Sequence, residues 1–411
     1  MKLYSNEYEC CGCEACANAC PTKAISMVPN FMGELYPKIN EDACIRCGKC
    51  TKVCDFKKQN VGHIPMEAYG AKTKDIASYK NATSGGVFSV LANAIIEEGG
   101  VVIGAMLEYD INKEELDVYH TIIDNKETIF RLQGSKYIQS RIGSVFADIR
   151  SLLKKDVPVL FCGTPCQVAG LKSFLEKDYN KLYTIDIVCH GVPSMIFFNS
   201  HIRYIEKTKK IKIKNVKFRE KEAEHPGIDI RYLWGNEQAK KHADVWPTLD
   251  SYYQLFLDGQ TYRDSCYSCK YANEKRQGDL SICDFWGADK EIPRETLKNE
   301  CINLSDGFSG VLVNTEKGKR LFKKNAEKMD FIPVKPEQII KWNPQLMAPS
   351  VKGIFWEEIR KQYRTGQKKF ETWYKKTYAK KIWNYKIKSM LGKIISERVK
   401  IKIKTFIAWS K

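Results

Sequence analysis

Apolar positions recur at helical spacing in the first part of the central region. Across residues 87–96 they return every three or four residues, which predicts a helix. A Ser-Gly-Gly turn at residues 84–86 comes directly before this segment, and a Gly-Gly pair at residues 99–100 supplies a stop after it. Residues 101–105 are then apolar apart from one glycine, and we expect them to form a buried strand.

Two more short apolar runs end in loops that contain cysteine. Residues 157–161 predict a strand, which leads through the loop 162–166 into a helix. Residues 182–188 predict another strand, which leads through the loop 189–194 into another helix. Loops that leave a strand end and enter a helix are favoured positions for ligands.

The alternation of strands and helices continues towards the end of this region. Residues 311–313 predict a strand, and residues 317–329 predict the helix that follows it. Strands that alternate with helices argue for an α/β or α+β body. Residues 55–66 have no strong periodicity and are interpreted as a linker between this body and the cysteine-rich start of the chain.

Cysteine use indicates metal or catalytic chemistry rather than disulfides. The chain has 411 residues, 16 cysteines and a hydrophobic fraction of 43%, so it can bury a core without covalent staples. Its first residues contain no apolar signal segment, and no run of about 18 apolar residues occurs. We therefore expect a cytoplasmic protein whose cysteines are kept for metals or catalysis.

The first 54 residues contain a duplicated cysteine motif. The spacing C-x2-C-x2-C-x3-C occurs twice, followed by Pro21 in the first copy and by Asp55 in the second. This spacing is typical of two 4Fe–4S clusters, in which the fourth cysteine of each copy binds the cluster of the other copy. A pair of zinc sites is the weaker alternative. The predicted ligands are Cys10, Cys13, Cys16 and Cys54 for one cluster, and Cys44, Cys47, Cys50 and Cys20 for the other.

The remaining cysteines leave a third metal centre open. Cys266 and Cys269 have the spacing of a metal clip, and Cys166 and Cys189 each follow a predicted strand. Neighbouring strand ends could bring the last two together, although a buried free cysteine often serves only as a small hydrophobic residue. Cys11 is expected to be a packing residue. No G-x-G-x-x-G opens a helix, so the common dinucleotide fingerprint is absent.

Positive charge is concentrated in the last part of the chain. The whole chain carries a net charge of +18, of which residues 366–411 carry +12. Lysines and aromatic residues such as Trp383 and Trp409 alternate there. Such a segment could bind an anionic membrane surface peripherally, or it could be a solvated basic helix that packs its aromatic face on the body. Nucleic acid is the least favoured partner.

Several ordered motifs resemble one known family. They are Thr83-Ser84-Gly85-Gly86-Val87, Gln133-Gly134-Ser135-Lys136-Tyr137-Ile138-Gln139-Ser140, Gly163-Thr164-Pro165-Cys166-Gln167, Cys189-His190-Gly191-Val192-Pro193-Ser194, Cys266-x2-Cys269 and Gly278-Asp279-Leu280-Ser281-Ile282-Cys283-Asp284-Phe285-Trp286-Gly287. Over roughly residues 65–350 the chain resembles the beta subunits of hydrogenases and dehydrogenases that use the deazaflavin coenzyme F420. The resemblance implies FAD and a further 4Fe–4S cluster in the body. It also implies Cys166, Cys189, Cys266 and Cys269 as ligands, with Cys283 departing from the usual glycine.

The same resemblance directs attention to nine residues as flavin contacts. A Ser-Gly-Gly turn at a helix N-terminus offers backbone N–H groups to a pyrophosphate, although alone it is more often an ordinary cap. A lysine near the ring can stabilise negative charge on a reduced flavin, and Lys136 and Tyr137 are the predicted catalytic residues. The predicted FAD contacts are Ser84, Gly85, Gly86, Gly134, Ser135, Lys136, Tyr137, Thr164 and Gln167.

These observations predict three parts: a dicluster ferredoxin-like domain (1–60), a FAD- and cluster-binding body (65–350) and a basic helical tail (351–411). We expect a flavin and iron–sulfur oxidoreductase that passes electrons between a ferredoxin-like carrier and a small organic acceptor or donor. An electron-transfer subunit without its own substrate and a non-enzymatic assembly protein are the alternatives. Neither the organic substrate nor the direction of electron flow follows from the sequence.

Overall fold

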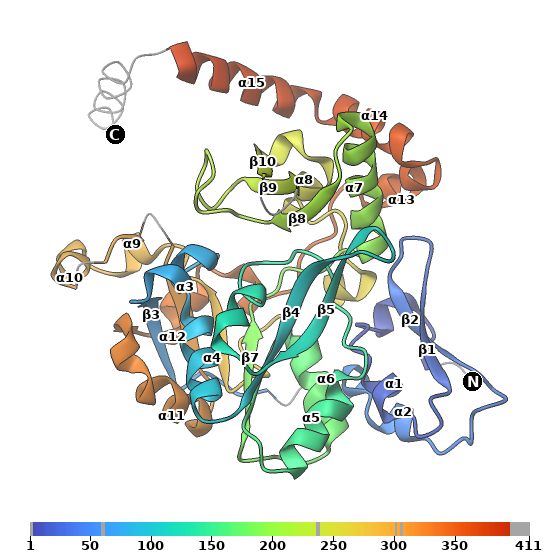
Figure 1. Ribbon diagram of the computed structural model, residues 1–411, viewed down its shortest axis with the longest axis vertical. Helices are drawn as coiled ribbons and strands as arrows, with labels where there is room; N and C mark the ends of the chain where they lie inside the picture. The colour runs from blue at the N-terminus through green and yellow to red at the C-terminus, as the bar shows by residue number, and fades with distance from the viewer. Residues whose placement is uncertain (1–2, 59–61, 236–238, 301, 305–306, 395–411) are drawn as a thin grey trace.

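A mixed eight-stranded sheet forms the centre of the protein in the computed structural model, which describes residues 3–58, 62–235, 239–300, 302–304 and 307–394 (Figure 1). The strand order is β13-β3-β12-β11-β7-β6-β4-β5. Strands β4, β6, β7 and β11 are parallel to their neighbours within this group, and antiparallel strands extend the sheet at both sides. The sheet strands are β3 (Glu67–Thr73), β4 (Val101–Asp110), β5 (Glu115–Ile123), β6 (Val159–Gly163), β7 (Leu182–Ile187), β11 (Leu280–Asp284), β12 (Ser309–Val313) and β13 (Met329–Val334).

Helices cover both faces of this sheet because its strands alternate apolar side chains between the two faces. On β6, Leu160 packs in the core beneath α4, whereas Val159 and Phe161 pack in the core beneath α5 and α6. The helices that flank the sheet are α3 (Ile76–Asn81), α4 (Val87–Glu97), α5 (Val145–Lys154), α6 (Pro165–Leu175), α9 (Ala288–Glu291), α10 (Arg294–Asn299), α11 (Glu316–Lys324) and α12 (Pro336–Ile340).

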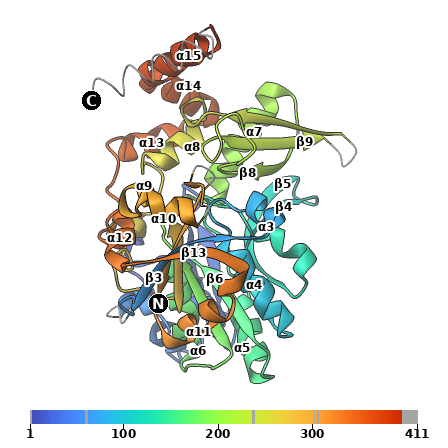
Figure 2. The same cartoon turned by 90° about the vertical axis from the view of Figure 1, so that its left-hand side faces the viewer.

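A second layer of helices and strands lies beyond one end of the sheet. Its three-stranded sheet has the order β10-β9-β8, and aromatic residues of α7, α8 and α14 pack with it in a common core. Figure 2 shows the C-terminal helices crossing the far side of this layer. The elements are α7 (Met195–Lys209), β8 (Ile213–Lys217), β9 (Ile230–Gly235), β10 (Lys240–Val245), α8 (Ser251–Leu257), α13 (Trp356–Arg364), α14 (Gln367–Thr377) and α15 (Ala379–Ile394).

The cysteine-rich start of the chain packs beside α5 and α6 (Figure 1). It contains α1 (Ala15–Ala19), α2 (Lys49–Lys52) and the antiparallel pair β1 (Ile25–Pro29) and β2 (Leu35–Ile39). The Glu14 carboxylate accepts the N–H groups of Ile142 and Gly143 at 2.9 and 3.0 Å. This contact fixes the small domain against the loop that leads into α5.

The predicted strand–helix units at residues 87–105, 157–166 and 182–194 are present, and the unit at 311–329 needs correction. There, α11 ends at Lys324 and β13 begins at Met329, so the predicted helix is too long. The segment 55–66 also differs from a free linker in its first part. The Asp55 carboxylate accepts the Tyr271 hydroxyl at 2.8 Å and holds this stretch on the body.

Candidate cluster and cofactor sites

The four predicted ligands of the first N-terminal cluster lie around one small cavity. This group, called the inner set, consists of Cys10, Cys13, Cys16 and Cys54. Burial raises the pKa of Cys16 well above its ordinary value, and the neighbouring Cys13, Cys10 and Cys54 raise it further. These four thiols therefore face one another, as the crossed assignment of the two motifs predicts.

The outer set surrounds a second small cavity. Cys20, Cys44, Cys47 and Cys50 line it, and Cys50 also lines the first cavity, so the two sets adjoin. The Ala24 N–H donates to Cys20 Sγ at 3.2 Å. Cys47 is exposed. The outer set thus lies at the surface, while the inner set faces the body.

The four body cysteines come together from three separate loops. Cys166 lies in the first turn of α6, Cys189 follows β7, and Cys266 and Cys269 lie in and after the 3-10 helix η5 (Asp264–Ser268). Burial raises the pKa of Cys189 to about 12, and the nearby Cys166 and Cys269 add to the shift. Burial likewise raises the pKa of Cys269 to about 11, with a contribution from Cys166. Burial raises the pKa of Cys266 well above its ordinary value, and the neighbouring Cys189, Cys269 and Cys166 raise it further, so the four thiols, the body set, lie together.

Cys11 lies between the inner N-terminal set and the body set. Hydrogen bonds with Cys13 and Cys166 raise the pKa of the buried Cys11 thiol well above its ordinary value. The pKa of Cys166 is lowered to about 7, first by the hydrogen bond from Cys11 and then by Thr164 and the charge of Arg263. Cys11 was predicted only to pack, and its position adds a direct contact between the two sets.

The surroundings of all three sets fit 4Fe–4S clusters, whose sulfurs accept backbone N–H groups. Such bonds reach Cys10 from Gly12, Cys54 from Lys57, Cys189 from Gly191 and Cys266 from Val192. Within the described ranges, no three His, Cys, Asp or Glu side chains are close enough together to hold a single metal ion.

A cavity of about 600 Å³ lies next to the body set. This volume is within the range of small-molecule and cofactor sites. The start of α4, the loop 132–140 and the ends of β6, β7 and β11 form its walls. Of the predicted contacts and ligands, the cavity is lined by Ser84, Gly86, Gly134, Ser135, Lys136, Tyr137, Thr164, Gln167, Cys166 and Cys189.

Two neighbours in the Ser-Gly-Gly turn have different surroundings. The Gly85 N–H donates to Ser309 Oγ at 2.9 Å, and a Cβ on Gly85 would lie 2.2 Å from the Ala71 carbonyl oxygen. Gly85 is therefore packed against the sheet and is not among the cavity residues. Ser84, by contrast, is among the cavity residues, and its buried Oγ has no hydrogen-bond partner among the described residues.

Comparison with known proteins assigns two parts of the chain. Residues 9–58 match the family described as "4Fe-4S dicluster domain". Residues 157–338 match the family that comprises the C terminus of the coenzyme F420 hydrogenase/dehydrogenase beta subunit. This chain joins a 4Fe–4S dicluster domain to a coenzyme F420 hydrogenase/dehydrogenase beta-subunit domain. The beta-subunit match includes all four body cysteines, whereas the predicted flavin contacts from Ser84 to Tyr137 precede it.

Individual relatives are distant or short. The coenzyme F420-dependent sulfite reductase of Methanocaldococcus jannaschii is 23% identical over 320 residues, which cover 77% of this chain and 46% of that protein. An uncharacterized polyferredoxin-like protein of the same organism is 45% identical over 53 residues, covering 11% of this chain and 32% of that protein. The chain thus spans less than half the length of either relative.

One similar solved structure comes from the F420-reducing [NiFe] hydrogenase complex of Methanosarcina barkeri. The similarity has a TM-score of 0.42 at 16% identity and covers 76% of this chain and 93% of that chain.

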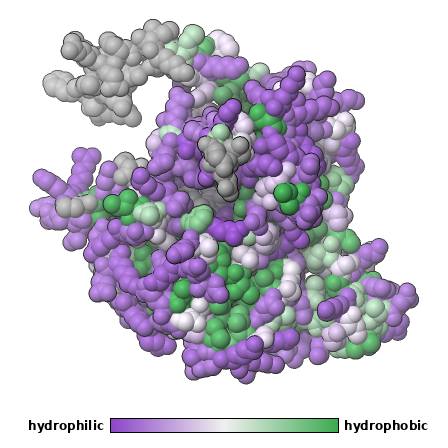
Figure 3. Space-filling view, viewed as in Figure 1, coloured by the Kyte–Doolittle hydropathy of each residue, from purple (hydrophilic) through white to green (hydrophobic). Residues whose placement is uncertain are grey.

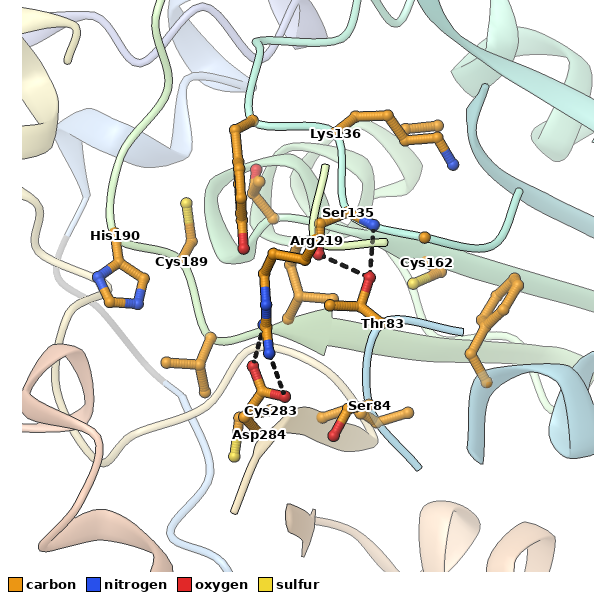
Figure 4. A pocket seen from close by; sticks show the side chains of 18 of the residues that line it. Thr83, Ser84, Ser135, Lys136, Cys162, Cys189, His190, Arg219, Cys283 and Asp284 are labelled. Atoms are coloured by element: carbon orange, nitrogen blue, oxygen red, sulfur yellow. Dashed lines mark hydrogen bonds and ion pairs between the residues drawn. The ribbon is translucent and has the colours of Figure 1, made fainter. Parts of the chain in front are cut away.

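Lys136, just ahead of the beta-subunit domain, turns its ammonium group away from the centre of the cavity. In Figure 4 its side chain extends away from Arg219 and Asp284. Its Nζ donates to the carbonyl oxygens of Gln133 at 2.7 Å and Leu132 at 2.9 Å. Burial lowers the pKa of Lys136 to about 7, and the nearby Cys162 opposes this shift. The lysine holds the loop 132–140 in place, and its catalytic role stays a prediction.

Tyr137 contributes an aromatic wall. Its ring stacks on Phe256 with centroids 4.2 Å apart and on Tyr253 with centroids 5.9 Å apart. Its carbonyl oxygen accepts the Tyr252 hydroxyl at 2.8 Å. These contacts lock the ring, so any ligand beside it meets a preformed surface.

Thr164 and Gln167 form a rigid corner at the start of α6. The Gln167 Oε1 accepts the Thr164 N–H and hydroxyl, each at 3.1 Å. Its Nε2 donates to the Ser140 carbonyl oxygen, also at 3.1 Å. The Gln167 amide is thus occupied within the protein. Thr164 Oγ1 also lies 3.2 Å from Cys166 Sγ, which links this corner to the body set.

The cavity wall contains an ion pair that the sequence did not predict. The Arg219 guanidinium binds the Asp284 carboxylate at 2.5 and 3.3 Å, and Figure 4 shows the pair. Arg219 also lies over the ring of Trp286, which is 50% exposed. Asp284 belongs to a quoted motif, but nothing in the lysine-rich sequence around Arg219 marks it as a site residue.

Two further polar residues of the wall, Thr83 and His120, were not among the predicted contacts. The Ser135 N–H and hydroxyl donate to Thr83 Oγ1 at 2.8 and 3.0 Å, which ties the loop 132–140 to the start of α4. His120 lies between Ser140 Oγ at 2.9 Å and the Cys162 carbonyl oxygen at 3.1 Å. Burial lowers the pKa of His120 to about 4, so the ring is neutral at physiological pH.

The C-terminal helices combine a packed aromatic side with exposed lysines. Phe370, Tyr374 and Tyr378 are buried in the core of the second layer, whereas Trp383 is 63% exposed. The predicted anchor Trp409 lies outside the described residues. Much of the visible surface is hydrophilic (Figure 3). Across the part of the chain that the structure describes, no helix is both long and apolar enough to cross a membrane. Binding to an anionic membrane surface stays a prediction.

Proposed function

We propose that this chain is a flavin and iron–sulfur oxidoreductase. It would pass electrons between a one-electron carrier and an organic two-electron acceptor or donor. The observation that carries the proposal is the serial arrangement of three cysteine sets between the surface and a cofactor-sized cavity. The iron–sulfur electron-transfer character agrees with the dicluster and beta-subunit families to which the two regions belong.

Each step of this series rests on a contact. The outer set is reached at the exposed Cys47, and Cys50 lines the cavities of both N-terminal sets. Cys11 joins the inner set to the body set through Cys13 and Cys166. Cys166 and Cys189 line the large cavity itself. When bound, 4Fe–4S clusters exchange single electrons, and a flavin converts between one-electron and two-electron steps.

The cavity residues favour an anionic, partly aromatic cofactor such as FAD. The N-terminus of α4 directs backbone N–H groups at this wall, which suits a phosphate group, and the unpartnered Ser84 hydroxyl adds a donor. The aromatic stack of Tyr137 and Phe256 offers an apolar surface and keeps water from that side. The exposed Trp286 at the cavity suits a flat organic partner. Because the related proteins are named for coenzyme F420, we propose a deazaflavin as the first candidate for the organic acceptor or donor that reacts with the bound FAD.

Metal and flavin analysis of the anaerobically reconstituted chain tests this proposal. We expect about twelve iron atoms per chain, four for each of three clusters, together with bound FAD. About eight iron atoms would remove the body cluster, and zinc in place of iron would overturn all three assignments. A chain that binds iron but not FAD would support the alternative of an electron-transfer subunit.

Ser84→Ala should weaken FAD binding by about 2- to 10-fold, because a neutral hydrogen bond contributes roughly 0.5–1.5 kcal/mol. Titration of the chain with FAD, followed by flavin fluorescence, measures the dissociation constant. Ser89→Ala is the matched control, since Ser89 lies on α4 with its hydroxyl already bonded to the Gly86 carbonyl oxygen at 2.7 Å. We expect Ser89→Ala to lower stability while the FAD affinity stays the same. Equal FAD affinities of wild type and Ser84→Ala would contradict the assignment.

Replacing both Arg46 and Lys49 by Glu should slow reduction by an acidic ferredoxin about tenfold or more at low salt. Both side chains are exposed beside Cys47, and exposed basic groups steer an acidic partner. Stopped-flow reduction at several salt concentrations gives the second-order rate constant.

The charge-matched control for this docking test is Arg294→Glu with Lys298→Glu on α10. Both residues are exposed, and α10 lies on the opposite side of the molecule from the dicluster domain (Figure 1). Its rate should remain close to that of the wild type. A similar slowing of both double variants would show that net charge, and not a docking surface at the outer set, governs the encounter.

A further inference from the structure

A buried arginine lies at the junction of the dicluster domain and the body. The Arg263 side chain is completely buried, with 0% exposure. Its Nε donates to the Cys10 carbonyl oxygen at 2.8 Å and its Nη2 to the Leu35 carbonyl oxygen at 2.9 Å, both in the dicluster domain. Its Nη1 donates to Gln139 Oε1 at 3.1 Å in the body. One guanidinium thus connects both parts.

The acceptors of Arg263 are all neutral, and this sets it apart from other buried arginines. Arg276 pairs with Asp186 at 2.7 Å, and Arg360 pairs with Glu34 at 3.1 Å. Arg263 forms no ion pair with a carboxylate in the part of the chain that the structure describes. Its guanidinium lies 4.0 Å from the centroid of the Tyr36 ring, and the nearby Glu34, which also acts on its charge, is paired with Arg360. A buried cation without its own ion-pair partner is costly, because the lost hydration is not replaced by a direct contact with an anion. A positive charge in this position therefore calls for an anion nearby.

The neighbours of Arg263 are ligands of two predicted clusters. It bonds directly to the peptide of Cys10, and its own carbonyl oxygen accepts the Cys266 N–H at 2.9 Å. Its N–H donates to the Val192 carbonyl oxygen at 3.0 Å, in the loop that follows Cys189. A Cβ on Gly12 would lie 2.9 Å from its Nη1, so the inner cysteine loop can approach only because residue 12 is glycine. The guanidinium therefore touches the loop of the inner set, while the backbone of the same residue is bonded to the loops around Cys189 and Cys266.

The electrostatics agree with this placement. A 4Fe–4S core held by four thiolates is negatively charged, and one-electron reduction adds another negative charge. A cation in a medium of low dielectric constant stabilises the reduced form.

We propose that Arg263 is a positioning residue that serves as the counter-charge shared by the inner dicluster site and the body site. It raises the reduction potentials of both clusters together and fixes the contact across which the electron passes. Its effect on the body cluster rests on the proposed function above, whereas its effect on the inner dicluster site does not. We expect no effect of Arg263 on the reduction potential of the outer cluster, because the outer set lies beyond the inner set.

The test is a redox titration of the anaerobically reconstituted full chain, followed by electron paramagnetic resonance. In Arg263→Gln, the one-electron reduction equilibria of the inner and body clusters should shift at least tenfold towards the oxidised form. That shift corresponds to about 59 mV for one electron. The signal of the outer cluster should keep its midpoint. Cys269→Ala, which lacks the body ligand, identifies the signals.

Two further variants separate charge from structure. Arg360→Gln removes another buried arginine that contacts the dicluster domain, but one already neutralised by Glu34, so the inner and body midpoints should stay close to the wild type. Arg263→Lys keeps the charge and should retain most of the wild-type midpoints, and it remains informative if Arg263→Gln fails to fold. Iron content checks that every variant is loaded.

Unchanged midpoints in a fully loaded Arg263→Gln chain would overturn the proposal. So would shifted midpoints in a fully loaded Arg263→Lys chain, or an equal shift of all three signals. If the wild type contains only two clusters, the body cluster of the proposed function is lost, while the shift of the inner cluster still decides the role of Arg263.

Discussion

Cys269→Ala is expected to remove about four iron atoms per chain and to leave the dicluster domain loaded. Cys269 lies beside Cys166 and Cys189, and three thiols are left at the body site after the substitution. Electron delivery to an organic acceptor should fall by orders of magnitude, since the site that joins Cys11 to the cavity is broken. Iron analysis and acceptor reduction, measured on the same anaerobic preparation, check both effects.

Cys283→Gly is the matched control for this experiment. Cys283 is also a half-buried cysteine in the cavity wall, but its Sγ donates to the Gly310 carbonyl oxygen at 3.6 Å and it is not a predicted ligand. We expect unchanged iron content in this variant. Loss of iron from Cys283→Gly together with full iron in Cys189→Ala would show that the body ligands are wrongly assigned.

Local patterns in the sequence predicted the parts of the fold that local physics determines. The duplicated cysteine spacing holds three thiols of each set within one short loop, so it could be recognised without any knowledge of the fold. Residues 87–105 carry their own periodicity and stop signal, and they form α4 and the first part of β4 as those signals predict. The body cysteines could not be grouped from local spacing alone. Cys166, Cys189 and Cys266 come together only through the order of β6 and β7 in the sheet and the position of the later loops.

The antiparallel strands at the edge of the sheet and the contacts in the cavity wall could not be predicted from local sequence patterns. Strands β3 and β13 pair along the edge of the sheet although they are about 260 residues apart in the sequence, as their bounds Glu67–Thr73 and Met329–Val334 show. No strand was predicted for β8, β9 and β10 of the second layer either. Arg219 meets Asp284 only because these layers adjoin, so its role depends on long-range packing that a linear pattern does not contain.

Lys136 shows how the same residue can satisfy a motif and still serve the scaffold. The resemblance placed it at a flavin ring, and it does line the cavity. Its ammonium group nevertheless donates to three backbone carbonyl oxygens. They belong to Arg131, the last residue of the 3-10 helix η3 (Lys126–Arg131), and to the next two residues, Leu132 and Gln133. A charge held by several carbonyls can orient the loop 132–140 whatever ligand the cavity accepts. Spacing alone could not distinguish these two roles.

The second large effect is expected from His201, which is buried between two carboxylates in the second layer. Its Nε2 lies 3.1 Å from Asp250 Oδ2, and its Nδ1 lies 3.0 Å from Glu371 Oε1 on α14. The Tyr232 hydroxyl donates to the same Asp250 oxygen at 2.6 Å. Burial alone would lower the pKa of His201, but the charges and hydrogen bonds of Asp250 and Glu371 raise it to about 10. The imidazolium therefore ties α14 to α7 and α8.

His201→Gln should destabilise the protein by about 3–5 kcal/mol at pH 6, because it leaves two buried carboxylates without their cation. The pKa of His201 rises from an ordinary 6.5 to about 10 on folding, so its stabilising effect is complete below about pH 6.5 and is lost as the pH rises towards 10. The difference in stability between wild type and variant should shrink over that interval. Urea unfolding at several pH values, followed by circular dichroism, measures this difference. His242→Gln, the same substitution at an exposed position on β10, should leave the unfolding midpoint unchanged. A difference that stays constant from pH 6 to 10 would show that packing, and not the buried charge, holds the C-terminal helices on the body.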